Sequence, residues 1–532
     1  MQKTIVLPEC SELVTGAWRR IRKTSKLAFF SAFITGFLTH LYMFTGKYPN
    51  ADEIVNLYTD NDVASHGRWL LKAVSYLSSD SSLPLVNGLF AILFLSLTAV
   101  VVVKLFSIER PVEVILTGWI LVSFPTVCTM FTYMYCADGY AASCLLAALG
   151  AYVTDRYRRG WIGGALLLTL SLGIYQSFVC FGIALLYTRL LQRLLCKRDD
   201  DREILRTVAS DIGAVGVAVV LYLAVTKLLL PTVTGVTLVD TMGVASMGET
   251  TAAGLFRGVA DAYHAFFTYF FRTSMLVSWR FVRYLHLLIG LMEGCLLLIL
   301  CFRTKRRSVL QLVLTLVLLP LLPLFYNTVY LMGAPYVHWL MIYSYATVYV
   351  LLFVLYDALT ESCRTSPPKR LCALPVLAGY AAAALALTAC LYTSVNDNEI
   401  YLALQLKYEN SYALVNRVVS SVEQAEGYTP ETPVYIGGTL GYGSYPPSKE
   451  VVFRALARNT GMFGESEYTL INTDTLFRTF ARNYVGVILH TPTNEEIAAV
   501  LASAAYRDMP VYPARGSVQN IDGVIVVKAS ND

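Results

Sequence analysis

The pattern of hydrophobic and polar positions divides the chain into a series of long apolar runs and a polar tail. Apolar windows of bilayer length fall near 27–46, 83–103, 113–133, 138–153, 209–230, 282–302, 308–326, 337–356 and 372–393. Runs of this length predict membrane-spanning helices, because about 20 apolar residues cross the hydrocarbon core of a bilayer. We therefore expect an α-helical polytopic membrane protein.

One further apolar segment, from Trp161 to Leu195, is too long for a single span and is basic at both ends. The sequence DRYRRG precedes it, and RLLQRLLCKR closes it. Basic flanks favour the cytoplasmic side of a membrane, so the chain is expected to enter and return. This predicts two short helices, about 161–174 and 176–194, with a turn near GIYQS, and brings the total to eleven spans.

The basic patches also predict an orientation. RRIRK, DRYRR, RLLQRLLCKR, RTKRR and SPPKR all fall on one side of an eleven-span arrangement, and the positive-inside rule makes that side cytoplasmic. The N-terminus is then cytoplasmic. Three long segments lie on the outer side of the cell membrane: 47–82, 231–281 and 394–532.

The pattern changes after residue 393. Residues 1–393, the expected transmembrane domain, hold 32 Lys and Arg against 22 Asp and Glu, whereas residues 394–532 hold 10 against 15. The tail begins with a helical pattern over 394–427. Strand-like runs follow at PVYIGG, YVGVILH and GVIVVKA, with the helical pattern TNEEIAAVLASAAY between the last two. Alternating strands and helices predict a small soluble α/β domain on the outer side.

Composition supports this division and narrows the partners. The chain is 56% hydrophobic and only 15% charged, as expected of a membrane protein. Its net charge of +5 arises in the membrane part, where a basic excess usually reflects cytoplasmic loops, so we expect no nucleic-acid partner. None of the 11 cysteines forms a CxxC pair with a histidine partner. The spacing therefore gives no metal site, and a metal requirement stays open.

The densest early cluster of acids lies in NADEIVNLYTDNDVASHGRW, from Asn50 to Trp69, directly after the first span. A carboxylate at the membrane interface is costly to bury, so Asp52 and Glu53 suggest a function. Such a pair can act as a general base or share a divalent cation, and a solvated loop is the alternative. The following HGRWLLKAVSYLSSD predicts an amphipathic surface helix. Its expected apolar face carries Trp69, Leu70, Ala73, Val74 and Leu77.

The order of these features resembles the glucosyl transferase II family of serotype conversion, polytopic GT-C enzymes that glucosylate O-antigen. Asp52-Glu53 matches the acidic pair of the first outer loop, and Gly67-Arg68-Trp69 matches a downstream motif that opens a helix. YCADGY, Tyr135 to Tyr140, resembles an aromatic-Asp-Tyr segment. Tyr175-Gln176-Ser177 resembles a Tyr-Gln element at a short hairpin turn. The resemblance covers roughly 25–360 and leaves 394–532 without a counterpart.

The resemblance implies transfer of a hexose, with glucose as the family's sugar, from a polyprenyl-phosphate sugar to a hydroxyl of a cell-surface polysaccharide. Asp52 would be the base, with Glu53 orienting it or binding substrate. Arg68 would bind the donor phosphate, with Arg257, Arg272 or a divalent cation as alternatives. The expected partners are this donor, a glycan acceptor, membrane lipid, and a partner glycosyltransferase and flippase of the same pathway. The further candidates for substrate binding are His66, Tyr135, Asp138, Tyr175, Gln176 and His338.

Other interpretations stay open at this point. Arg68 is equally compatible with an interfacial arginine whose head reaches water, and lone histidines near an interface are more often structural. Asp60 and Asp62 are read as loop solvation, and the tail is expected to help hold the acceptor. A transporter or flippase of lipid-linked glycans is the main alternative, although no internal repeat supports it. A structural assembly protein would leave the Asp52 cluster unexplained.

Overall fold

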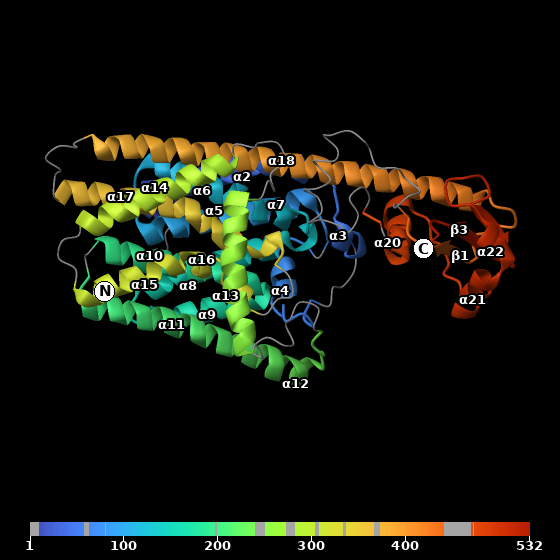
Figure 1. Ribbon diagram of the computed structural model, residues 1–532, viewed down its shortest axis with the longest axis horizontal. Coiled ribbons are helices and arrows are strands. Elements are labelled where there is room, and N and C mark those ends of the chain that lie inside the picture. The colour runs from blue at the N-terminus through green and yellow to red at the C-terminus, as the bar shows by residue number, and fades with distance from the viewer. Residues whose placement is uncertain are drawn as a thin grey trace, which may run out of the picture.

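A bundle of long helices and a small sheet beyond one end of it make up the structure, a computed structural model (Figure 1). It describes residues 10–57, 63–79, 81–196, 199–239, 251–272, 282–303, 308–332, 337–365, 373–440, 470–471 and 473–531.

Helices of membrane-spanning length dominate the bundle. Within the described ranges eight helical stretches are long and apolar enough to cross a membrane. They contain α2 (Lys23–Thr45), α5 (Pro84–Phe106), α8 (Ala137–Arg156), α10 (Val179–Cys196), α11 (Asp201–Ala224), α14 (Val282–Arg303), α17 (Ala346–Thr365) and α18 (Leu374–Glu423). A ninth is the bent pair α6 (Pro111–Ser123) and α7 (Pro125–Phe131). Two shorter apolar segments are α9 (Gly160–Ile174) and Val309–Phe325, which comprises α15 (Val309–Leu318), η5 (Leu319–Leu321) and α16 (Leu322–Phe325).

Each of the eleven expected segments therefore falls on one of these helices, and the expected helical polytopic membrane fold is confirmed. The remaining helices of the membrane part lie outside these apolar segments or flank them. They are α1 (Cys10–Arg20), α3 (Ala51–Val55), α4 (Leu71–Ser75), η1 (Met134–Cys136), η2 (Gln176–Phe178), η3 (Val225–Leu229), α12 (Leu230–Thr234), α13 (Ala252–Phe267), η4 (Thr268–Arg272), η6 (Thr328–Leu331), η7 (Trp339–Met341) and η8 (Tyr343–Tyr345). Helix α13 crosses the long axis of the bundle (Figure 1).

The bend of 43° between α6 and α7 has a local cause. Pro125 has no N–H and its ring blocks an unbroken helix, so carbonyls of the preceding turn lose their helical donors. Side chains from other helices replace those donors. Nε2 of His40 lies 2.7 Å from the Val122 carbonyl oxygen, and the Tyr343 hydroxyl donates to the Leu121 carbonyl at 2.6 Å. The break is thus satisfied inside the apolar bundle, where an unpaired carbonyl would be costly.

The expected hairpin over 161–194 is confirmed. Helix α9 ends at Ile174, Tyr175 has an extended backbone, and α10 begins at Val179. Helix α10 then returns to the level at which α9 began. Its Arg193 donates to Asp155, five residues before α9, at 2.7 Å.

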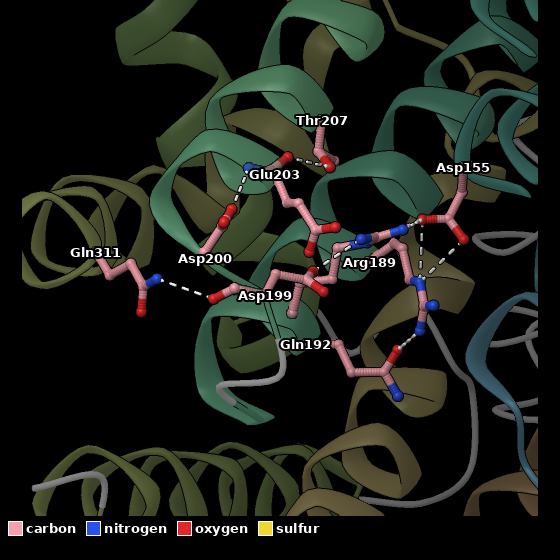
Figure 2. A network of polar contacts seen from close by, with 9 residues as sticks. Asp155, Arg189, Gln192, Asp199, Asp200, Glu203, Thr207 and Gln311 are labelled. Carbon is pink, nitrogen blue, oxygen red and sulfur yellow. Dashed lines mark hydrogen bonds and ion pairs between the residues drawn. The ribbon is translucent and has the colours of Figure 1, made fainter. Parts of the chain in front are cut away.

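A network of polar contacts ties the helix ends together at this end of the bundle, which we call the ion-pair end (Figure 2). Asp155 accepts hydrogen bonds from both Arg189 and Arg193, and Arg193 also binds Asp199 at 2.7 Å. The side-chain amide of Gln311 donates to the Asp199 carbonyl at 3.1 Å. A cavity of about 690 Å³ opens here, and Arg189, Arg193 and Asp199 of this network line part of it. The basic segments 155–159 and 189–196 therefore lie at one end of the bundle, as expected, while 304–307 and 366–370 lie outside the described residues.

The opposite end carries α3 and α4, and we call it the site end (Figure 1). Helix α4 corrects one expectation, because it is only five residues long and does not bury the predicted apolar face. Leu71 and Ser75 are buried in it, whereas Ala73 and Leu77 are exposed. The reason is its packing against α8: a Cβ on Gly139 would lie 2.6 Å from Cδ1 of Leu71.

The long helix α18 connects the bundle with the small sheet (Figure 1). It passes residue 393 without a break, so the expected division into two domains lies inside one helix and stays a prediction. Beyond it come β1 (Val434–Gly437), α20 (Asp474–Phe480), η10 (Ala481–Val485), α21 (Asn494–Ala502), α22 (Ala504–Asp508), β2 (Val518–Ile521) and β3 (Val524–Lys528). The strand order is β1-β3-β2, with β1 parallel and β2 antiparallel to the buried central strand β3.

Two of the three expected strands, at PVYIGG and GVIVVKA, are therefore present. The expected strand at YVGVILH is wrong, since its only pairing among the described residues is an isolated bridge between Pro433 and His490. The π-helical turn of η10 reaches Val485, and Gly486 then takes the left-handed conformation (φ 82°). Neither conformation fits an extended strand. Strand β2 was not expected.

Candidate active site

The one-turn helix α3 presents the two acids of the first loop in opposite environments. The side chain of Asn50 caps its start, accepting from the Glu53 backbone N–H at 2.8 Å. Asp52 is exposed, whereas Glu53 is only 1% exposed. The adjacent acids are therefore not equivalent, and Asp52 is the one that a substrate can reach.

Glu53 is held as a buried anchor. Its Oε1 lies 3.3 Å from Nζ of Lys47, and its Oε2 accepts from the backbone N–H of Tyr135 at 3.3 Å. Burial raises the pKa of the Glu53 carboxyl, although Lys47 and the Tyr135 amide act in the opposite direction. Burial also lowers the pKa of Lys47. These contacts fix α3 to the turn between α7 and α8.

Arg68 is the cation of the cluster. It follows Gly67, whose left-handed backbone (φ 71°) turns the chain toward the bundle. The Arg68 guanidinium carbon lies 4.8 Å from the ring centroid of Tyr175, and Nη1 lies 3.4 Å from the Tyr140 hydroxyl. Within the described ranges no carboxylate lies within ion-pair distance of it, and its Nε is buried without a hydrogen-bond partner. The geometry leaves donor capacity for an anion.

The loop that carries Arg68 is clamped onto the hairpin turn. The side-chain amide of Gln176 donates to the His66 carbonyl at 2.8 Å and to the Tyr222 hydroxyl at 2.9 Å. The Leu70 N–H donates to the Gly173 carbonyl at 2.9 Å. His66 and Gln176 therefore lie in the same cluster as Arg68 and Tyr175. The contacts to the first loop come from the hairpin of α9 and α10, where the sequence predicted a turn.

The charges of both Asp52 and Arg68 act on the phenol of Tyr133. Burial is the largest cause of the raised pKa of its phenol; the charge of Asp52 raises it further and that of Arg68 opposes. The phenol thus lies within electrostatic reach of both side chains. Its ring is 6.4 Å from that of Tyr140 and 6.3 Å from that of His338, between centroids. Sequence reasoning missed Tyr133, although it stands only two residues before the YCADGY motif.

Two other candidates on this side have largely structural contacts. The Tyr135 hydroxyl accepts from the Asn56 amide at 3.4 Å, which adds a second link between α3 and η1. Asp138 is fully buried at the start of α8, and its Oδ2 accepts from the Ser78 hydroxyl at 2.6 Å. In the described part of the chain its Oδ1 has no hydrogen-bond partner. Ser78 also accepts from Asn87, so Asp138 connects the loop after α4 with α5.

The remaining candidates are not joined to the cluster by any contact of the described residues. Arg257 is 86% exposed on α13, 3.8 Å from Asp261. The side chain of Arg272 lies outside the described residues, and so do Asp60 and Asp62. Among the side chains that the structure describes, no three His, Cys, Asp or Glu residues lie close enough to hold a metal ion.

Comparison with known protein families matches residues 41–355, more than half of the chain, to the family described as Glucosyl transferase GtrII. The chain belongs to the glucosyl transferase GtrII family. The match begins inside α2 and ends inside α17, so it contains the whole Asp52–Arg68 cluster and excludes the tail. Membership in the GtrII family implies a membrane-embedded glucosyltransferase, and the resemblance seen in the sequence is confirmed at the level of the family. No curated protein and no solved structure matched the chain.

Proposed function

We propose that this GtrII family member transfers glucose from a polyprenyl-phosphate sugar to a hydroxyl of a cell-surface glycan on the outer face of the cell membrane. The GtrII match supports glucosyl transfer. The observation that carries the lipid-linked donor is Arg68, a cation without a carboxylate partner in the described ranges, in the same outer loop as the exposed acid Asp52.

Asp52 is the general base in this proposal. As the acceptor oxygen bonds to the anomeric carbon, the bond from that carbon to the phosphate oxygen breaks, and the acceptor proton passes to the Asp52 carboxylate. The exposed Asp52 carboxylate is open to an acceptor arriving from water. Glu53 takes no proton in this scheme, because its oxygens are engaged with Lys47 and the Tyr135 amide.

The cation stabilises the leaving group. Polyprenyl phosphate departs with its electron pair on the phosphate oxygen, and a guanidinium donates to two such oxygens at once. The Arg68 guanidinium lies over the Tyr175 ring, and this cation–π contact helps to hold it in place. Tyr140 and Tyr133 surround it with groups that do not neutralise it.

The proposed orientation places the site end outside the cell and the ion-pair end in the cytoplasm. It follows from the basic segments 155–159 and 189–196 at the ion-pair end. A flippase of lipid-linked glycans, the alternative weighed from the sequence, has less support, because the Asp52–Arg68 cluster lies at a helix-end loop. The family match also favours a transferase.

The test is an in vitro transfer assay with purified full-length protein, an acceptor glycan and a panel of polyprenyl-phosphate sugars. Glucose transfer from polyprenyl-phosphate glucose, with the nucleotide sugar inert, is the expected result. Activity with the nucleotide sugar alone would overturn the proposed donor. Parallel reactions with EDTA decide whether a divalent cation assists Arg68.

A further inference from the structure

The tail contacts α3, the helix that carries Asp52, although the two segments are far apart in the sequence. The side-chain amide of Asn483 donates to the Ile54 carbonyl at 3.0 Å, a contact between residues 429 positions apart. Helix α20 packs against α3 beside this bond. Asn483 lies outside the residues of the GtrII match, whereas Ile54 lies inside them and is two residues from Asp52.

Helix α3 needs such a contact. Five residues form barely more than one turn, and helices this short are not stable by their own hydrogen bonds. The first N–H groups and the last carbonyls of any helix also lack partners inside it. The Asn50 side chain satisfies the start of α3, and the Asn56 N–H caps the Asp52 carbonyl at 3.0 Å. The Ile54 carbonyl, also in the last turn of α3, accepts from the Asn483 side-chain amide.

Asn483 itself is held firmly. It stands in the middle of η10, a π-helical turn, a rare conformation that often occurs at functional positions. On both sides of it aromatic rings anchor the turn. The rings of Phe480 and Tyr484 are stacked with centroids 4.7 Å apart, and both pack on Tyr408 of α18, at 5.9 and 5.7 Å. Through α18 the amide is fixed to the bundle.

We propose that Asn483 is a positioning residue, through which the tail holds α3 so that Asp52 faces the acceptor hydroxyl. The inference rests on the proposed role of Asp52 as the base. It differs from the expectation that the tail binds the acceptor, since here the tail acts on the catalytic geometry and not on the affinity.

Steady-state transfer by Asn483→Ala, in the full-length protein, separates the two roles. We expect kcat to fall about tenfold with the acceptor KM changed less than about twofold, because a displacement of about 1 Å at a catalytic group is costly. Asn483→Gln keeps an amide donor and should recover part of the rate. Asn494→Ala, which removes an exposed asparagine of the same tail, is the matched control and should leave both parameters unchanged. A raised KM with an unchanged kcat would overturn the proposal.

Hydrogen exchange tests the same proposal without activity. In Asn483→Ala we expect amides of residues 51–56 to exchange faster, while those of β3 stay protected. Unchanged exchange over 51–56 would overturn the positioning role even if Asp52 proved essential. Conversely, faster exchange in Asn483→Ala together with full activity of an Asp52→Asn variant would still support the contact between Asn483 and α3. That pair of results would refute only the proposed function.

Discussion

The guanidinium of Arg68 stacks on the ring of Tyr175, 4.8 Å from its centroid. This contact brings the first loop of the chain onto the turn of a membrane hairpin. It also leaves the edge of the guanidinium, including a buried Nε, without a carboxylate among the described residues. We propose that this arrangement binds an anionic group, and its residues can be tested one at a time.

Substitution of Arg68 tests the leaving-group site. Arg68→Ala should lower kcat/KM by a factor on the order of 10² to 10³, because a preorganised donor to the developing charge is lost. Arg68→Lys keeps the charge but loses the fork and the stacking on Tyr175, and we expect a loss of about tenfold or more. Transfer rates of purified variants provide the measurement. Arg202→Ala, an exposed arginine at the opposite end, is the control; equal effects of the two alanine variants would refute the assignment.

Gly173 tests whether the packing of the hairpin turn positions this loop. A Cβ at Gly173 would lie 2.4 Å from Cζ2 of Trp69, the residue after Arg68, so the indole must move. We expect Gly173→Ala to reduce the transfer rate about tenfold while the protein still inserts. Gly216→Ala on α11 meets no atom within 4 Å and should be neutral. Full activity of Gly173→Ala would show that the position of Trp69 is irrelevant to catalysis.

Glu53 should make stability depend on pH with a definite sign. Burial raises its pKa above the ordinary value of 4.5, so folding takes up a proton between the unfolded and folded values. The stabilisation is complete below the unfolded pKa and is lost as pH rises through the folded pKa, with a slope of at most about 1.4 kcal/mol per pH unit. Glu53→Gln lacks this group. In detergent, the melting temperature of Glu53→Gln should therefore rise relative to that of the wild-type protein as pH rises from 4.5 toward neutrality. A constant difference across that range would contradict the prediction.

Reporter fusions test the orientation. Alkaline phosphatase fused after Gly427, just beyond the end of α18, should be active, because we place that position outside the cell. The same reporter fused after Arg364, at the end of α17, should be inactive. The opposite pair of results would invert the topology and move the Asp52 cluster to the cytoplasm.

Much of the fold follows from local pattern. The apolar windows located the spanning helices because bilayer thickness fixes their length, and the basic flanks of 161–195 forced a return that the structure places at Tyr175. The same reasoning predicted that the first outer loop, which carries Arg68, and the hairpin turn at Tyr175 and Gln176 lie on one side of the membrane. The resemblance to the glucosyl transferase II family then singled out these residues.

Contacts set by packing could not be read from the sequence. The apolar face assigned to 66–80 was wrong because α4 packs on Gly139 rather than lying flat on a surface. The expected role of Glu53 beside Asp52 stays a prediction, and its contact with Lys47 carries no signal in the sequence. Tyr133 carries no pattern that separates it from the other 34 tyrosines. The Asn483–Ile54 contact has no local signal at all.

The most direct test of the central claim is the transfer rate of Asp52→Asn, which removes the charge of the proposed base and keeps its shape. We expect normal membrane insertion with a rate reduced by a factor on the order of 10² to 10⁴. Asp508→Asn, an exposed acid of the tail, should retain the wild-type rate. Wild-type transfer by the Asp52→Asn protein would refute the assignment of Asp52 as the base.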